Sequence, residues 1–343
     1  MKKIFFLIVM SFNLLTSPTY SENNLPELIH DPSKLFSFDD RLFGYASGIE
    51  GQALSLFEFV PEENLIEFLS PVFDYQESPQ WASDFQKWNK TGEFDAPSTT
   101  NDGKHIFYTV YDEKENLIQD AIGLVVNNGT PDEPDWEDLG LVIQSEGEDF
   151  KTARCMDPSI IEDQDRIFMV FGSQAGGIYL TELNPDTMKL AKNPTRTSTA
   201  IDKHRFINLA KNFSANGEEG ENEAAYIHRN GKFYYLFVNW GRCCNGIDST
   251  YHIIHGRAFS ISGPYFDKNG VPLTDGGGSL FLGNEGRYIG PGHIGILESE
   301  KLGDIVSYHF YDSETNGISN IAIRELTWDS DGWPVLGEHL FFH

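Results

Sequence analysis

A segment that begins with an acidic residue and leads into an apolar strand recurs along the chain at a nearly constant interval. Copies start at Asp31, Asp95, Asp157 and Glu223, and a degenerate fifth copy has His293 where the others have an acid. Successive starts are 64, 62, 66 and 70 residues apart. Self-similarity at a fixed period indicates a repeat architecture, which constrains the fold more than any local pattern does.

Each copy has the pattern of β structure. Turn residues follow the acidic segment in four copies, and a strand dense in Phe, Tyr, Val and Ile comes next. These turns are expected at 38–40, 101–103, 162–165 and 229–231. One or two helical turns within residues 200–212 are the only helical candidate beyond the N-terminus. A unit of about 65 residues holds about four strands, so the sequence predicts an all-β fold, a five-bladed β-propeller around a central channel.

Residues at equivalent positions of the blades lie at equal distances from a propeller axis, so their side chains converge. We therefore expect Asp31, Asp157 and Glu223 to share one pocket at an end of the channel, with His30 beside Asp31 and His293 completing the set. Like charges held together raise at least one pKa, and paired carboxyl groups with different pKa values are the groups that hydrolyse glycosides. The alternative is that each Asp-Pro is only a turn that caps the preceding loop.

No rival catalytic motif stands out in the sequence. A GxSxG nucleophile, an HExxH zinc motif and a phosphate-binding loop are all absent. Sugar rings stack on aromatic side chains, and five of these are candidates to line the pocket, although each could equally belong to the core between blades. They are Trp81, Trp88, Phe94, Tyr108 and Trp240.

Residues 1–21 read as a secretory signal peptide. A basic start precedes an apolar stretch from Ile4 to Leu15, and Thr19 and Ser21 occupy plausible cleavage positions. A membrane anchor is the alternative, but the stretch is shorter than the roughly 18 to 20 residues that span a bilayer. The sequence predicts residues 22–343 as one secreted or periplasmic propeller domain, with no membrane insertion of the mature chain.

The formal net charge of −27 argues against nucleic acid as a partner. Binding to phosphates depends on Lys and Arg, and here 25 of them are outnumbered by 52 acids. The charge does not indicate an oligomeric state. It is consistent with a solvated secreted protein whose partner is a polysaccharide or oligosaccharide.

Three cysteines are too few for a disulfide framework. A bond between the adjacent Cys243 and Cys244 would close a strained ring, and pairing either with Cys155 would need a proximity that the sequence does not show. Their bonding is left open. Their spacing and the lack of matching histidines also argue against zinc.

Taken together, the motifs resemble glycoside hydrolase family 43, and most of all its endo-α-1,5-L-arabinanases. The matching residues span nearly the whole mature chain in the expected order. They are His30-Asp31-Pro32-Ser33, Met156-Asp157-Pro158-Ser159, Phe171-Gly172-Ser173, Glu223-Ala224, the run 234–251, Gly256-Arg257, Gly263-Pro264-Tyr265, Gly290-Pro291-Gly292-His293 and Asp331-Gly332-Trp333-Pro334.

This resemblance implies an inverting hydrolase on a five-bladed propeller. By position, Asp31 would be the general base, Glu223 the general acid, and Asp157 the residue that orients the acid and adjusts its pKa. The resemblance also implies that His293 helps to hold a water-rich calcium ion near the axis, with no organic cofactor.

The expected substrate-binding residues are His30, Phe94, Ser173, Trp240 and Arg257. The chain departs from the family pattern at Phe94-Asp95-Ala96-Pro97, where "WAPD" is common, and behind Gly172-Ser173 and Glu223. These departures are expected to affect the choice of sugar more than the chemistry.

Three functions remain open. The first is cleavage of α-1,5-arabinan. The second keeps the mechanism with another sugar or an exo mode, as in an arabinofuranosidase or β-xylosidase. The third is a propeller that binds glycans without cutting them.

Overall fold

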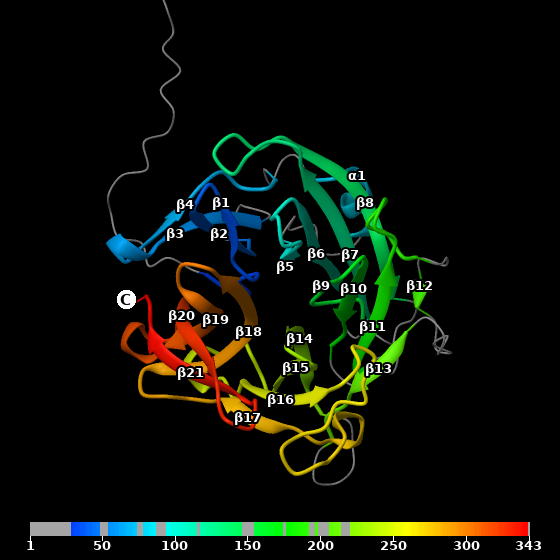
Figure 1. Cartoon of the computed structure of the whole chain (residues 1–343). Coiled ribbons are helices and arrows are strands. Elements are labelled where there is room, and N and C mark those ends of the chain that lie inside the picture. Colours follow the sequence, from blue (N-terminus) through cyan, green and yellow to red (C-terminus); the bar gives the residue numbers. More distant parts are fainter. Residues whose placement is uncertain are drawn as a thin grey trace, which may run out of the picture.

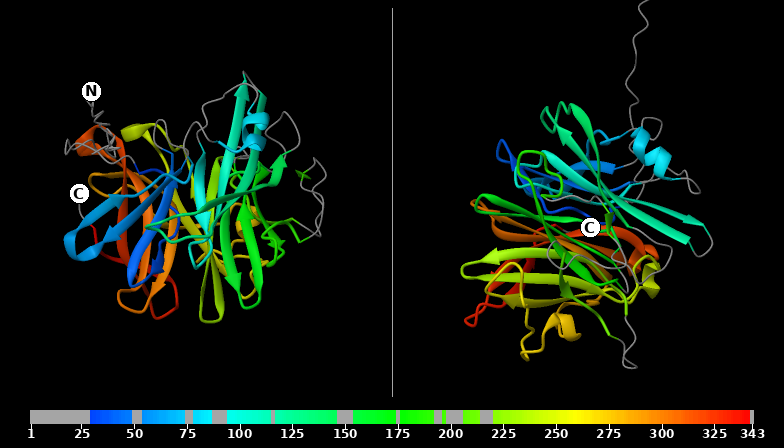
Figure 2. Two further views of the ribbon diagram at one scale, coloured as in Figure 1. Left: turned by 90° about the horizontal axis from the view of Figure 1, so that it is seen from above. Right: turned by 90° about the vertical axis from the view of Figure 1, so that its right-hand side faces the viewer.

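The computed structural model describes residues 29–48, 54–73, 78–86, 94–114, 117–145, 154–173, 176–191, 196–197, 206–213 and 220–341. Within these residues five sheets, antiparallel except for one short strand, surround a common axis, as the face-on view in Figure 1 and the side views in Figure 2 show. The predicted five-bladed propeller is therefore confirmed. The predicted signal peptide, residues 1–21, and Trp88 lie outside the described residues.

Each blade is a meander of strands that follow one another along the chain. Blade 1 consists of β1 (Phe36–Phe38), β2 (Arg41–Ser47), β3 (Leu54–Val60) and β4 (Leu65–Phe68). Blade 2 consists of β5 (Asp95–Thr99), β6 (His105–Lys114), β7 (Leu117–Asn127) and β8 (Trp136–Ser145), with the short β12 (Arg196–Thr197) parallel to β8. Blade 3 consists of β9 (Ser159–Asp163), β10 (Arg166–Phe171), β11 (Ile178–Leu183) and β13 (Ile207–Ala210).

Blade 4 consists of β14 (Asn222–Asn230), β15 (Phe233–Trp240), β16 (His252–Ala258) and β17 (Ser279–Leu282). Blade 5 consists of β18 (Tyr288–Ser299), β19 (Gly303–Asp312), β20 (Ile318–Trp328) and β21 (Pro334–His339). The described helices are short: α1 (Gln80–Phe85) and the 3-10 turns η1 (Pro61–Glu63), η4 (Gly246–Asp248), η5 (Leu273–Asp275) and η6 (Ser313–Thr315). No helix in this described part of the chain is long and apolar enough to cross a membrane.

The hairpins between the first two strands of blades 1 to 4 lie where the sequence predicts turns. The prediction of helical turns within residues 200–212 is wrong where it can be judged. Ile207–Ala210 forms β13, which pairs antiparallel with β11, because a sheet edge satisfies its backbone groups better than an isolated helical turn would. Residues 200–205 lie outside the described part.

The core lies between neighbouring blades. Five clusters of buried side chains fill the five interfaces, one of which joins blade 5 back to blade 1. In that last interface, Ser319 Oγ donates to the Ile29 carbonyl over 2.6 Å, and Ile29 and Ile323 are buried together. Apolar packing and this bond close the ring, so the axis is surrounded on all sides.

One residue in the segment that enters each blade has a left-handed backbone, although none is glycine. The five φ angles lie between 47° and 57°, at Asp31, Ala96, Asp157, Ala224 and His293. This regularity corrects the repeat register, because the equivalents of Asp31 in blades 2 and 4 are Ala96 and Ala224, one residue after the predicted Asp95 and Glu223. Non-glycine residues in this region are strained, and such strain gathers at functional sites.

The backbone N–H of each left-handed residue donates to a buried or half-buried side chain. The five bonds run from Asp31 to His309 Nδ1 (3.1 Å), Ala96 to Ser47 Oγ (2.9 Å), Asp157 to Thr109 Oγ1 (3.0 Å), Ala224 to Asp157 Oδ2 (3.0 Å) and His293 to Asn239 Oδ1 (3.0 Å). All but the bond between Asp157 and Ala224 use a side chain on the second strand of the preceding blade. These bonds fix the entering segments against the ring, and so fix the direction of the side chains at one end of the channel.

Candidate active site

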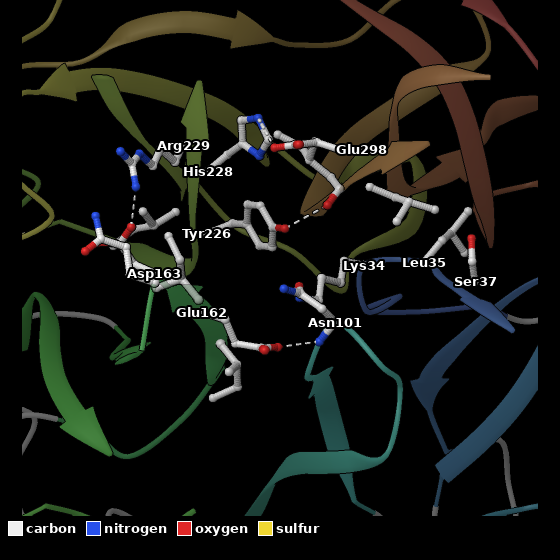
Figure 3. Close-up of a pocket in the computed structure, with 16 residues that line it drawn as sticks. Lys34, Leu35, Ser37, Asn101, Glu162, Asp163, Tyr226, His228, Arg229 and Glu298 are labelled. Atoms are coloured by element: carbon white, nitrogen blue, oxygen red, sulfur yellow. Dashed lines mark hydrogen bonds and ion pairs between the residues drawn. The ribbon is translucent and has the colours of Figure 1, made fainter. Parts of the chain in front are cut away.

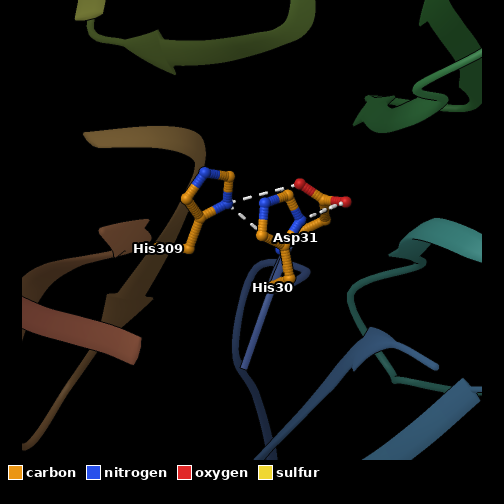
Figure 4. A group of neighbouring side chains, drawn as sticks. All are labelled: His30, Asp31 and His309. Carbon is orange, nitrogen blue, oxygen red and sulfur yellow. Dashed lines mark hydrogen bonds and ion pairs between the residues drawn. The ribbon is translucent and has the colours of Figure 1, made fainter. Parts of the chain in front are cut away.

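Asp31 is surrounded by imidazole rings at the axis (Figure 4). Its Oδ2 lies 2.8 Å from His30 Nδ1 and accepts a hydrogen bond from Ser47 Oγ over 2.8 Å. Its Oδ1 lies 3.3 Å from both His293 Nδ1 and His309 Nδ1. Both carboxylate oxygens therefore have close polar partners.

The histidines around Asp31 play different electrostatic parts. Burial lowers the pKa of His309 to about 3, so this ring is neutral, and its Nδ1 accepts the Asp31 N–H. Burial also opposes protonation of His30 and His293, but the Asp31 carboxylate outweighs it and raises both pKa values. In return, although burial alone would raise the pKa of Asp31, His30 and His293 hold it well below its usual value. Asp31 is thus ionised across the neutral range.

A chain of hydrogen bonds supports His30 from behind. Its Nε2 lies 2.7 Å from the Tyr311 hydroxyl, which accepts the Cys244 N–H over 2.7 Å. Cys243 and Cys244 form a disulfide with each other, so the pairing that the sequence left open is the adjacent one. Cys155 is buried, and its backbone N–H donates to Asp120. The disulfide lies beside the pocket and helps to orient the ring that contacts Asp31.

Glu223 and Asp157 form a second group, held on the neighbouring blades. Glu223 Oε2 accepts from Ser173 Oγ over 2.8 Å, and its Oε1 accepts from the Tyr251 hydroxyl over 3.0 Å. Asp157 Oδ2 accepts the N–H of Ala224, the residue after Glu223. The two carboxyl groups are therefore tied to the same turn of backbone.

Both of these carboxyl groups hold protons more tightly than usual. Burial raises the pKa of Asp157 to about 8, and the charge of Glu223 adds to the effect. Burial also raises the pKa of Glu223, against the two hydroxyl hydrogen bonds, and the Asp31 charge raises it further. Two coupled carboxyl groups in a buried site lose their protons in separate steps, so the pair keeps one proton near neutral pH.

The structure thus brings Asp31, Asp157, Glu223 and His293 together, and we call these four residues the axial pocket. Each carboxyl group shifts the protonation of at least one other, and His293 responds to all three. If these acids only capped loops, they would not lie close enough to shift one another's pKa values or that of His293. The predicted convergence of the three acids is confirmed.

The sheet register explains how Glu223 reaches this pocket from one residue earlier in the chain. Glu223 pairs with Asn239, and a bulge follows before the next pair, Tyr226 with Phe237. A bulge adds a residue to one strand and re-aims its side chains. In blade 5 the matching position is Gly292, where a Cβ would lie 2.1 Å from the Tyr251 ring, so only glycine leaves room for the tyrosine that contacts Glu223.

The residues around the axial pocket include possible metal ligands. Ring nitrogens and a carboxylate oxygen of His30, Asp31 and His309 lie within 4.8 Å of one another. Calcium prefers six to eight oxygen ligands, whereas both Asp31 oxygens already have partners, so these residues do not form a calcium cage. The negative charge around His293 suits a cation that keeps most of its waters, with His293 as a single protein ligand.

The predicted substrate-binding residues have different fates. His30 and Ser173 contact the axial pocket directly, and Trp240 lies on β15 next to Asn239, the residue paired with Glu223. Phe94 does not line the pocket. It is fully buried and stacks on Tyr108 with ring centroids 4.9 Å apart, because the aromatic side chain fills the interface between blades 1 and 2.

The sequence prediction also places Arg257 wrongly, because this residue lies away from the axial pocket. It pairs with Tyr235 on β15, four residues along the strand from Asn239, which puts it roughly 13 Å from the Glu223 end of the blade. There its guanidinium lies 4.0 Å from the Trp333 ring centroid and donates to the Asp331 carbonyl. Arg257 therefore joins blades 4 and 5 instead of contacting the axial pocket.

The remaining aromatic candidates serve the core. Tyr108 is fully buried, and Trp81 on α1 packs against the same cluster and donates to Asp138. Four residues that contact the site were missed, namely Ser47, Tyr251, His309 and Tyr311. Ser47 and His309 had a repeat signal. Polar residues stand on or just after the second strand of each blade, 13 to 16 residues after its left-handed residue, namely Ser47, Thr109, Ser173, Asn239 and His309.

Comparisons with known proteins match this geometry. Residues 69–334 match the model described as "Glycosyl hydrolases family 43". The chain is 36% identical over 242 residues to the extracellular exo-α-(1→5)-L-arabinofuranosidase of Cellvibrio japonicus, across 68% of this chain and 66% of that protein. It is 35% identical over 257 residues to an extracellular endo-α-(1→5)-L-arabinanase of Bacillus subtilis, across 74% of this chain and 68% of that protein.

Solved structures agree with these sequence matches. A family 43 endo-arabinanase from Bacillus licheniformis superposes with a TM-score of 0.75 and 30% identity, over 90% of this chain and 98% of that chain. The alignments to the two curated relatives span about two thirds of their lengths.

Proposed function

The chain belongs to glycosyl hydrolases family 43, a family of glycosidases, and we propose that it hydrolyses α-1,5-linked L-arabinan or arabino-oligosaccharides with inversion at the anomeric carbon. The observation that carries the proposal is the opposite protonation of the carboxyl groups in the axial pocket. Asp31 is held ionised, whereas the Asp157–Glu223 pair is held partly protonated. One pocket therefore contains both a base and an acid at the same pH.

Asp31 acts as the general base in this proposal. Its carboxylate takes a proton from a water molecule, which attacks the anomeric carbon from the side opposite to the leaving sugar. His30 and Ser47 hold the carboxylate in place through Oδ2, at 2.8 Å each. An inverting pair needs roughly 6.5 to 9.5 Å between its carboxyl groups, which leaves room for that water.

Glu223 acts as the general acid and gives its proton to the departing glycosidic oxygen. Ser173 and Tyr251 position the carboxyl group by donating to its two oxygens. Asp157 accepts a hydrogen bond from the adjacent backbone N–H of Ala224. The coupled pair shares one proton, and when Glu223 carries this proton the negative charge of Asp157 favours its retention until the glycosidic bond breaks. Asp157 is thus a positioning residue that adjusts the acid.

A hydrated calcium ion held by His293 is part of the proposal. Such an ion would supply positive charge beside the sugar. The Asp31, Asp157 and Glu223 charges that favour a cation at this place also raise the pKa of His293, so ion and proton compete. Titration of the protein with calcium and with EDTA, followed by tryptophan fluorescence and activity, tests whether an ion binds.

The mode of attack has two candidates, endo and exo. The Bacillus subtilis relative is named as an endo-arabinanase, which favours internal cleavage, and the Cellvibrio japonicus relative is named as an exo-arabinofuranosidase, which favours release from an end. Early products from linear arabinan separate the two, because endo cleavage gives a ladder of oligosaccharides and exo cleavage gives one short product. No shortened product at all would count against the substrate.

We also propose that the protein is exported from the cell. This proposal rests on the N-terminal segment and on the names of the relatives. Both curated relatives are described as extracellular, and residues 1–21 have the pattern of a signal peptide. N-terminal sequencing of protein from the culture medium or periplasm checks this point, with a mature chain that starts near residue 22 as the expected result.

A further inference from the structure

A second pocket lies at the other end of the channel, away from the axial pocket (Figure 3). Its volume is about 540 Å³, and all five blades contribute to its lining. The inner strands connect the two ends. His228, for example, follows Glu223 by five residues, which corresponds to roughly 16 Å of strand. We call this second cavity the distal pocket.

Some charged groups of the distal pocket are already paired. Arg229 Nη1 lies 2.6 Å from Asp163 Oδ1, and the Tyr234 hydroxyl donates to the other oxygen of Asp163 over 2.7 Å. The Asn101 N–H donates to Glu162 Oε1 over 2.5 Å. These contacts hold the lining in place, so the pocket is formed without a ligand.

Lys34 is a buried cation in this lining. Its residue is 7% exposed, and its Nζ donates to Asn101 Oδ1, the one acceptor for it among the described hydrogen bonds. Burial lowers the pKa of Lys34 to about 8, although Glu162 and Asp102 raise it in part. An ammonium group has three donors, and burying them without acceptors is costly, so a ligand oxygen here would be stabilised.

Polar side chains of blades 4 and 5 face the same space. The Glu298 side chain is 71% exposed, and its Oε1 lies 3.9 Å from Nε2 of the buried His228, too far for a good hydrogen bond. Burial lowers the pKa of His228 to about 4, so the ring is neutral. Between these groups Tyr226 presents its ring, with its hydroxyl engaged by the Ile296 carbonyl (Figure 3).

We propose that the distal pocket binds a short neutral saccharide. Sugar hydroxyls both accept and donate hydrogen bonds, so one molecule can accept from Lys34 and donate to the Glu298 carboxylate. The apolar face of a sugar ring suits the lining side chains Tyr226 and Leu297. The volume lies within the usual range of small-molecule pockets.

Other classes of ligand fit less well. An anion would meet Lys34 but also Glu162 and Glu298, and a cation would meet the Lys34 ammonium at the buried side. A wholly apolar ligand would leave all these groups without partners. The choice of probe rests on the proposed function, whereas the site itself does not.

Calorimetric titration with linear α-1,5-arabinotriose tests the proposal. The Glu223→Gln protein is used so that the probe stays intact. Two molecules per chain are expected to bind, one at each end of the channel. Lys34→Met in the same background is expected to reduce this to one. Glu298→Gln should weaken only the second site, by about tenfold, the size of one lost hydrogen bond to a charged group. Glu63→Gln, on an exposed turn, is the matched control and should change neither site.

The outcomes separate the two proposals. One molecule bound before and after Lys34→Met would overturn the distal site and leave the proposed function intact. One molecule before and none after would support the distal site and count against arabinan as the substrate. If Lys34→Met does not fold by circular dichroism, Glu298→Gln decides, and an unchanged second affinity overturns the proposal.

Discussion

The two ends of the inner strands belong to the same repeat but differ in chemistry. At the axial pocket, three half-buried carboxyl groups lie with the buried His293, and the pKa values of all four are shifted. At the distal end, hairpin turns carry charges that form ion pairs, such as Arg229 with Asp163. Side chains from the repeated segments converge at both ends of the channel, but the carboxyl groups that shift one another's pKa values lie at the axial end.

The left-handed residue that enters each blade explains this difference. In blades 1 and 3 it precedes the first strand, and in blades 2, 4 and 5 it lies at a register shift within that strand. Its side chain, or that of the residue before it, is thereby turned out of the regular ladder. Its N–H is bonded to a side chain in every blade, which holds a strained backbone in place. The distal turns also contain left-handed residues that are not glycine, such as Asp40 and Gln164, but these lie at exposed positions.

The largest expected contrast between the two ends is in turnover. Glu223→Gln should lower kcat by about 10³-fold, because it removes the general acid and keeps the shape. Asp165→Asn, an exposed change in the distal β9–β10 turn, should leave kcat unchanged. Initial rates on linear arabinan measure both. Equal rates for the two variants would remove catalysis from the axial pocket.

A smaller effect with a defined sign is expected at Asp157. Asp157→Asn removes the carboxyl group that is coupled to Glu223. The negative charge of Asp157 can then no longer favour the shared proton on Glu223, so the pKa of Glu223 falls. The alkaline limb of the pH–rate profile should move to lower pH, and kcat at the optimum should fall by about 10²-fold. An alkaline limb that stays in place or moves up would contradict the assigned role.

Loss of a hydroxyl donor should move the same limb the other way. Tyr251 donates to Glu223 and stabilises its ionised form, so Tyr251→Phe should raise the pKa of Glu223. We expect a shift of the alkaline limb to higher pH and a loss of about tenfold in kcat. Ser173→Ala should act in the same direction, since Ser173 donates to the other oxygen. Shifts of the same sign in Asp157→Asn and Tyr251→Phe would refute this account of the pair.

Removal of calcium should have the smallest effect. A hydrated ion acts through water at a distance, where one charge is worth about 1 kcal/mol, or roughly fivefold in rate. Dialysis against EDTA should lower kcat by about this factor, and calcium should restore it. Complete loss of activity with EDTA would require an ion held by more protein ligands than His293.

The sequence was sufficient for the fold because the repeat and the strand pattern agree. The five entering segments and four inner hairpins lie where the spacing predicts them. The register was predicted less accurately, since a bulge places Glu223 one residue ahead of Asp31 and Asp157 in the repeat. Glu221, two residues earlier, is another acid that the sequence alone does not distinguish from it.

Side-chain destinations were harder to predict than strands. Phe94 and Arg257 belong to matching motifs, yet one fills a core and the other joins two blades. Tyr251 lies at the end of the loop before β16, 28 residues after the Glu223 that it contacts. The space for its ring depends on Gly292 of blade 5. Such pairings depend on packing between blades, which a single sequence does not display.

The configuration of the first product tests the central claim most directly, that Asp31 activates water while Glu223 protonates the leaving sugar. Proton NMR of arabinotriose hydrolysis, recorded before the product anomers equilibrate, identifies the anomer that is released. The account predicts β-arabinofuranose at the newly formed reducing end, opposite to the α linkage that was cut. Release of the α anomer would mean that a carboxylate attacks the sugar itself, and would contradict the proposed roles.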